Sequence, residues 1–254
     1  MQEFYHKFYT QYLGCDFEML VFGSSGYPIV LFPTSLGRYY EMKDCGLIHA
    51  AEHLIDSGKL KIYCVDGIDS RSWYNYSIHP ADRVKTHIAY ERTILNDVIE
   101  FAKFECASKD VAVAGCSFGG YHALNLAFKH PDKIKFLLSM SGEFDIHQFI
   151  FGYYDDNCYF NNPTDYMPNL TDPWYLDRIK KMLIVLGTGE RDESLEDNKA
   201  MSEILHAKAI PHLLDVRTSS GHDWDSWKKM FPDYLSLMLE TLEKEQSKQY
   251  KSQI

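Results

Sequence analysis

A glycine-flanked serine is the residue of this chain best suited to covalent chemistry. Residues 115–119 read G-C-S-F-G; they follow the apolar run 111–114, and a helical pattern begins at residue 118. This arrangement is typical of a nucleophile elbow, in which glycines allow a turn too tight for side chains and the strained serine projects above the sheet edge. Ser117 is therefore predicted to attack acyl carbonyl groups.

A serine hydroxyl is a weak nucleophile until a base removes its proton, and His222 is the best placed histidine for that role. It lies in the polar loop 219–223, after the apolar run 212–217 and before the last helical pattern. Most of the other histidines lie inside helical patterns or at their ends, where a surface or capping role is expected.

The third member of such a triad is an acid that orients the imidazole and stabilises its charged form. The loop after the apolar run 182–187 offers Asp192 first and Glu190 second, because the acid should lie a few residues past the strand end. The resulting order Ser117, Asp192, His222 is the one that α/β-hydrolases use.

Two N–H groups are needed to hold the negative oxygen that forms during acyl transfer. Phe118 N–H is one candidate, since it follows the nucleophile at the start of a helix. The second is expected from Ser35 or Leu36, in the loop after the apolar run 28–33. The alternative for this loop is an ordinary helix cap built on Thr34 or Ser35.

Several motifs together resemble the putative esterase family of α/β-hydrolases, which includes feruloyl-type esterases, S-formylglutathione hydrolase and the mycolyltransferases. They are G-C-S-F-G-G-Y-H-A-L from residue 115, H-P-D from 130, S-G from 141 and the more specific G-H-D-W-D-S-W from 221. The resemblance spans about residues 18–242 and implies that Ser117, Asp192 and His222 fall on the family's triad. Cys116 and the stretch 151–163 depart from the family pattern.

The elements that must position these groups alternate along the chain. Strand-like runs occupy 16–22, 28–33, 60–65, 111–115, 134–140, 182–187 and 212–217. Helical patterns occupy 39–57, 81–107, 118–129, 194–208 and a last stretch from 224. This alternation predicts a single α/β domain over 1–254, of the α/β-hydrolase fold, with a mostly parallel central sheet flanked by helices on both faces. The polar tail 243–254 is expected to fray.

Residues 143–178 interrupt the alternation with a stretch too long for an ordinary connection. Such an excursion usually leaves the carboxyl edge of the sheet, where ligands bind, so a lid-like insertion is predicted. The aromatic stretch 151–163 is expected to form a lid or pocket wall; the alternatives are a packed surface excursion and a dimer contact. The candidate substrate-binding residues are Trp73, Tyr153, Tyr154 and Trp224.

Composition narrows the function classes. The net charge of −10 and the lack of a basic cluster argue against nucleic acid and anionic membranes as partners. No apolar run approaches membrane-spanning length, the first residues do not resemble a secretory signal, and the six cysteines lack regular spacing. Reduced thiols and a cytoplasmic location are therefore expected. The 18 tyrosines suit a cleft wall or a subunit interface, which leaves a homo-oligomer open.

Three function classes fit these features. The first is a hydrolase of carboxylic esters or thioesters, and the second is an acyltransferase that uses the same triad. The third is a non-catalytic binding module with a hydrolase fold, which the presence of all three triad residue types disfavours. The expected partner is a small-molecule ester or thioester. No cofactor and no metal is expected, and the neighbouring Asp155 and Asp156 are interpreted as solvated loop residues.

Overall fold

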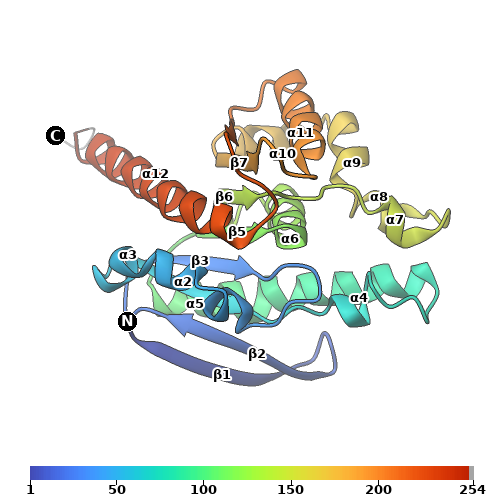
Figure 1. The fold of residues 1–254 in the computed structure, drawn as a ribbon, viewed down its shortest axis with the longest axis horizontal. Coiled ribbons are helices and arrows are strands. Elements are labelled where there is room, and N and C mark those ends of the chain that lie inside the picture. The colour runs from blue at the N-terminus through green and yellow to red at the C-terminus, as the bar shows by residue number, and fades with distance from the viewer. Residues whose placement is uncertain (252–254) are drawn as a thin grey trace.

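The computed structural model describes residues 1–251, and the strands within them form one mixed sheet of eight (Figure 1). In chain order they are β1 (Glu3–Thr10), β2 (Cys15–Phe22), β3 (Tyr27–Phe32), β4 (Leu60–Val65), β5 (Val111–Cys116), β6 (Ile134–Met140), β7 (Leu183–Gly189) and β8 (Leu213–Arg217). They lie in the order β1-β2-β4-β3-β5-β6-β7-β8. The β1–β2 and β2–β4 pairs are antiparallel and the others are parallel. The predicted α/β fold with a mostly parallel sheet is confirmed.

Helices cover both faces of the sheet because side chains of each buried strand alternate between two apolar cores. Val30 and Phe32 of β3 face one core, whereas Ile29 and Leu31 face the other. The first core is covered by α4 (Pro80–Thr93), α5 (Glu100–Glu105), α6 (Phe118–Lys129) and α11 (Leu195–Ala207), the second by α1 (Glu41–Asp44), α2 (Leu47–Ala50), α3 (Glu52–Asp56) and α12 (Trp224–Lys251). Within residues 1–251, no helix combines the length and the apolar character needed to cross a membrane.

Two predicted helices are divided in the structure. The stretch 39–57 forms the three short helices α1, α2 and α3. Gly46, with a left-handed φ of +81°, separates α1 from α2, and Ala51 separates α2 from α3. The stretch 81–107 is helical from Pro80 to Glu105, but a π-helical segment (η2, Ile94–Ile99) separates α4 from α5. A π-helical segment has a wider turn than an α-helix, so the spacing of apolar residues that predicts an α-helix does not reveal it.

The two ends of the chain differ most from expectation. β1 was missed because it is an edge strand whose side chains are mostly exposed, so it lacks an apolar run. Residues 243–251 continue α12 as helix, and 252–254 lie outside the described residues; the fraying of 243–254 stays a prediction. Two contacts hold this part of the helix against the body of the protein, Lys59 to Glu243 at 3.3 Å and Lys135 to Glu245.

The insertion 143–178 carries four short helices, the last of which extends one residue past it. They are α7 (His147–Ile150), α8 (Asp156–Tyr159), α9 (Pro163–Asn169) and α10 (Pro173–Ile179), and α7 and α8 pack against α4 (Figure 1). Its role as a lid stays a prediction, as does the treatment of 1–254 as one domain.

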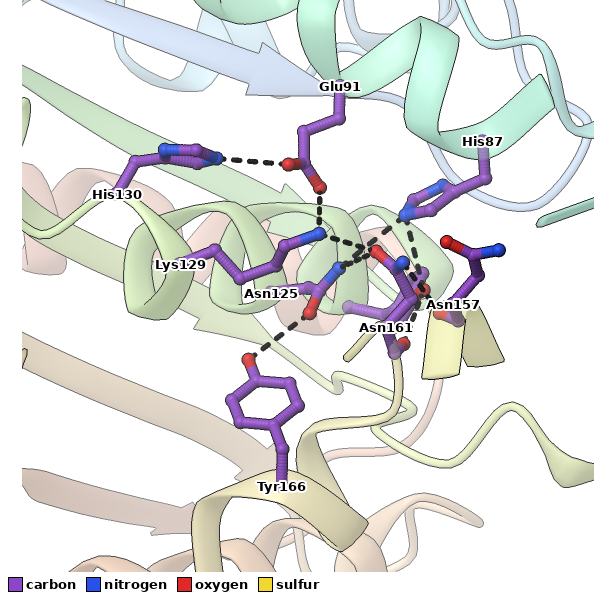
Figure 2. Close-up of polar contacts among 9 residues, drawn as sticks. His87, Glu91, Asn125, Lys129, His130, Asn157, Asn161 and Tyr166 are labelled. Carbon is purple, nitrogen blue, oxygen red and sulfur yellow. Dashed lines mark hydrogen bonds and ion pairs between the residues drawn. The ribbon is translucent and has the colours of Figure 1, made fainter. Parts of the chain in front are cut away.

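A buried polar network joins the insertion to the helix that follows Ser117 (Figure 2). Lys129 Nζ on α6 donates to Glu91 Oε2 at 2.6 Å and to Asn161 Oδ1 at 2.8 Å. Asn125 Nδ2 also donates to Asn161 Oδ1, at 3.1 Å, and its own Oδ1 accepts from Tyr166 OH at 3.1 Å. The insertion is thus seated on side chains of α4 and α6, and its deletion would disturb both helices.

Candidate active site

Ser117 occupies a sharp turn between β5 and α6. Its φ of 54° and ψ of −126° are strained for a residue with a side chain, and its backbone N–H donates to Met140 O at 2.8 Å. A Cβ on Gly119 would overlap the carbonyl oxygens of Phe32 and Pro33, so the turn can pack against β3 only with glycine there. This is the local geometry that the G-C-S-F-G motif predicts.

His222 lies in the loop between β8 and α12 and reaches Ser117 across 105 residues of sequence. Its Nε2 is 2.9 Å from Ser117 Oγ, and its Nδ1 is 2.8 Å from Asp192 Oδ1. Because the carboxylate can only accept, Nδ1 carries a proton and Nε2 is free to accept the serine proton. The structure therefore brings together the three residues that the sequence predicts as a triad.

Asp192 is held by groups that sequence reasoning missed as parts of the site. Ser141 Oγ donates to Asp192 Oδ2, and Ser194 N–H donates to Oδ1 at 2.9 Å. Trp227 Nε1 donates to Ser141 Oγ at 2.8 Å, and its ring meets His222 edge-on at 5.1 Å between centroids. The only signals in the sequence were the S-G after β6 and the second Trp of G-H-D-W-D-S-W.

The electrostatics favour the charge distribution that proton transfer needs. Burial raises the pKa of Asp192, but hydrogen bonds from His222, Ser141 and Ser194 outweigh burial and lower it to about 2. Burial lowers the pKa of His222, but Asp192, Glu193 and Glu143 raise it above its ordinary value of 6.5. Asp192 therefore stays ionised and stabilises a positive His222.

The candidate oxyanion donors differ in what their amides do. Phe118 N–H lies in the first turn of α6, where backbone amides have no partner inside the helix. Ser35 N–H makes no hydrogen bond to any group in residues 1–251. Leu36 N–H donates to Asp69 Oδ2 at 3.1 Å. The engaged amide of Leu36 favours Ser35 as the second donor, and both assignments stay predictions.

The interpretation of this loop as a helix cap on Thr34 or Ser35 is wrong. The next helix, α1, begins at Glu41 with Tyr40 as its N-cap residue. Thr34 instead donates from its N–H to Glu41 Oε2 at 2.9 Å and from Oγ1 to Glu41 Oε1 at 2.8 Å. The loop is thus fixed by a side chain of α1 and does not cap it.

Trp73 cannot contact a substrate in this structure. Its side chain has no exposed surface and packs with Phe118, Tyr121 and Phe149 behind the nucleophile. The prediction of Trp73 as a substrate-binding residue is therefore corrected. Trp73 instead contributes to the apolar cluster that contains the first turn of α6.

The other three candidate substrate-binding residues lie at the surface or next to the triad. Tyr153 is half-buried, and its hydroxyl donates to Asp155. Tyr154 is 46% exposed and stacks on His147 of α7. Trp224 is half-buried and packs edge-on against Trp227, one ring away from His222. Substrate contact by these three stays a prediction.

An acidic cavity of about 340 Å³ borders the triad. Its lining includes Glu143, Glu193 and Ser194, and Ser194 Oγ lies 3.3 Å from His222 Nδ1. Glu143, Glu193 and His222 place possible metal-ligating atoms within 4.8 Å of one another. Both ring nitrogens of His222 already face Ser117 and Asp192, so the arrangement is better suited to tuning the imidazole than to binding a metal.

A second cavity, of about 460 Å³, is lined by none of the triad residues. It lies where the insertion meets the end of α6, between Phe128, Tyr166 and Tyr175. Ser117 lines neither cavity, but Ser194 on the wall of the acidic cavity contacts His222, so the acidic cavity is the better candidate for substrate.

Comparisons with known proteins agree with the fold and identify the family. A family model described as "Putative esterase" matches residues 11–238. A ferulic acid esterase is 18% identical, covers 94% of this chain and 97% of that chain, and has a TM-score of 0.76. An S-formylglutathione hydrolase from Agrobacterium tumefaciens is 14% identical, with 94% of each chain covered and a TM-score of 0.72. A fluorophosphonate-binding serine hydrolase from Staphylococcus aureus is 15% identical, covers 94% and 98%, and has a TM-score of 0.66. At these identities the likeness shows the fold alone. A search of curated proteins gives no match.

Proposed function

This chain belongs to the putative esterase family and is an esterase of the α/β-hydrolase fold, and from this premise we propose that it cleaves carboxylic esters or thioesters through an acyl-enzyme on Ser117. The observation that carries the proposal is the position of His222, with Nε2 on Ser117 Oγ and Nδ1 on Asp192. A base that is hydrogen-bonded to the nucleophile and oriented by an acid is what activation of serine requires.

In the proposed reaction, Ser117 Oγ attacks the carbonyl carbon while His222 Nε2 takes the hydroxyl proton. The oxygen of the tetrahedral intermediate is held by Phe118 N–H and by a second amide from the loop after β3. The bond to the leaving alcohol or thiol breaks as His222 returns its proton to that group. A water, deprotonated by the same Nε2, then releases the acid and restores Ser117.

The acyl acceptor separates the two enzymatic alternatives. Water as acceptor makes the protein a hydrolase, and an alcohol as acceptor makes it an acyltransferase with the same acyl-enzyme. The names of similar structures suggest feruloyl esters and S-formylglutathione as substrates to screen, beside short-chain esters. Product analysis with and without an added alcohol distinguishes the two outcomes.

The test is covalent trapping. A fluorophosphonate should add once per chain, and peptide mapping should place the adduct on Ser117. Intact-mass analysis during turnover of p-nitrophenyl acetate should show an acetylated chain. A native protein that reacts with neither reagent would favour the non-catalytic binding module.

The pH dependence follows from His222, which must be neutral to accept the Ser117 proton. Its pKa is raised, so kcat/KM should fall as pH is lowered through a value above 6.5. Glu193→Gln removes a charge that raises this pKa, and the acidic limb should move to lower pH. Glu196→Gln is the matched control, since this side chain is 80% exposed and pairs with Lys199. An equal shift in both variants, or none in Glu193→Gln, would contradict this explanation.

We also propose a reducing compartment, the cytoplasm, for this protein. All six cysteines are free, and Cys64, Cys116 and Cys158 are buried as thiols. A small-molecule ester remains the proposed partner, and nucleic acid is not among the proposed partners. Homo-oligomerisation stays a prediction.

A further inference from the structure

The loop after β3 is held by three side chains from later parts of the chain. Glu41 accepts hydrogen bonds from Thr34 N–H and Oγ1. Tyr74 OH donates to Ser35 Oγ at 2.8 Å, and Asp69 Oδ2 accepts from Leu36 N–H at 3.1 Å. The N–H groups of Thr34 and Leu36, on either side of Ser35, therefore each donate to a carboxylate. The N–H of Ser35 has no hydrogen-bond partner within residues 1–251.

Leu36 shows that the loop is constrained. Its φ is +60°, in the left-handed region that residues with a side chain rarely adopt, and its side chain is 53% exposed. Burial of this side chain therefore does not explain the conformation. Gly37 N–H donates to Thr34 O at 2.9 Å and closes a turn in which Leu36 is the third residue, a position that favours positive φ. The hydrogen bond from Leu36 N–H to the Asp69 carboxylate is a second constraint on the peptide between Ser35 and Leu36.

Asp69 is itself locked in place. It is 2% exposed, and its second oxygen, Oδ1, lies 3.0 Å from His122 Nε2. His122 is 5% exposed and lies one turn after Phe118 on α6, and its ring meets the Phe118 ring edge-on at 4.9 Å. One carboxylate thus connects the loop after β3 with the helix that carries the other oxyanion donor.

We propose that Asp69, held by His122, is a positioning residue that presents Ser35 N–H beside Phe118 N–H to the oxyanion of the tetrahedral intermediate. This inference rests on the acyl-enzyme mechanism proposed above. Asp69 does not touch substrate. It accepts the hydrogen bond of Leu36 N–H and thereby holds the loop in the orientation in which Ser35 N–H is the free donor. An interaction of this kind contributes in the transition state and little in the bound ester.

The test compares Asp69→Ala with Asp69→Asn. Asparagine keeps an oxygen that can accept from Leu36 N–H, so its acylation rate with p-nitrophenyl acetate should stay within about 3-fold of wild type. Alanine removes the acceptor, and the acylation rate should fall about 10- to 100-fold. The affinity for a trifluoromethyl ketone, which forms an oxyanion on Ser117, should fall by a similar factor. Binding of the product acid should be unchanged.

Stability is separated from positioning by two further variants. Asp69→Leu/His122→Phe replaces both buried partners by apolar groups and keeps the space filled, so it should fold and still lose acylation rate. Asp110→Ala removes a carboxylate that accepts from Tyr27 at the opposite end of β5, and should cost stability without changing acylation.

The outcomes distinguish the two proposals. A wild-type protein that forms no acyl-enzyme on Ser117 overturns the proposed function itself. A wild-type protein that does form it, beside an Asp69→Ala or double variant that folds and acylates at the wild-type rate, overturns only the positioning role. Equal losses of acylation rate in Asp69→Asn and Asp69→Ala would also overturn that role, because the loss would then not depend on an oxygen that accepts from Leu36 N–H.

Discussion

Replacement of Ser117 by alanine is expected to lower kcat for ester hydrolysis by about 10⁵- to 10⁶-fold. The variant keeps the cavity, His222 and the amides of the loop after β3, but it has no oxygen on which an acyl group can be held. Binding of ester should therefore persist while turnover stops. Steady-state hydrolysis of p-nitrophenyl acetate, with binding of the product acid measured in parallel, checks both parts.

Ser202→Ala serves as the matched control for this loss. Ser202 lies on α11 and contacts His212, away from the triad, so its removal should leave kcat within the error of wild type. Both variants should unfold at nearly the wild-type temperature. If Ser117→Ala kept about a tenth or more of the wild-type activity, the nucleophile would have to be another residue.

Asp192→Asn is expected to lower kcat by about 10⁴-fold with little change in the fold. The amide nitrogen can donate to His222 Nδ1, which moves the imidazole proton to Nε2 and leaves no acceptor for the Ser117 proton. The loss should not be recovered at higher pH, because the tautomer and not the charge is wrong. A pH series of kcat/KM measures this directly.

Glu190→Gln decides between the two acids that the sequence left in competition. Glu190 is exposed, and its carboxylate accepts a long hydrogen bond of 3.4 Å from Ser219 N–H. This variant should therefore retain nearly full activity. The reverse pattern, an active Asp192→Asn and an inactive Glu190→Gln, would contradict the assignment of Asp192.

The sequence predicts the sheet well because its inner strands are buried on both faces and read as apolar runs. The predicted runs match β4 and β6 at their full bounds, and β3 and β5 within a residue at each end. The same feature located the loops of Ser117, Asp192 and His222, since each follows the carboxyl end of a parallel strand. Their meeting in space follows from the strand order, which the apolar runs do not give.

The rest of the site depends on contacts between residues that are far apart in the sequence, and local sequence patterns do not reveal such contacts. Ser141 supports Asp192 because β6 pairs with β7, and the amide of Leu36 is engaged because Asp69, 33 residues later in the sequence, lies beside it. Trp73 was misplaced because its loop lies at the functional edge, whereas its indole turns inward to the core behind Phe118. In each case tertiary packing, and not residue type, decides the role.

The position of β8 has a consequence for how activity is lost. β8 is the last strand of the sheet and is only partly buried, yet the loop that follows it carries His222, while Ser117 lies in the sheet centre. An edge strand detaches at a smaller free-energy cost than a central one. In mild denaturant, turnover should therefore disappear while circular dichroism still reports an intact fold, and dilution should restore it. The active fraction of the enzyme at a given denaturant concentration is then set by this local opening.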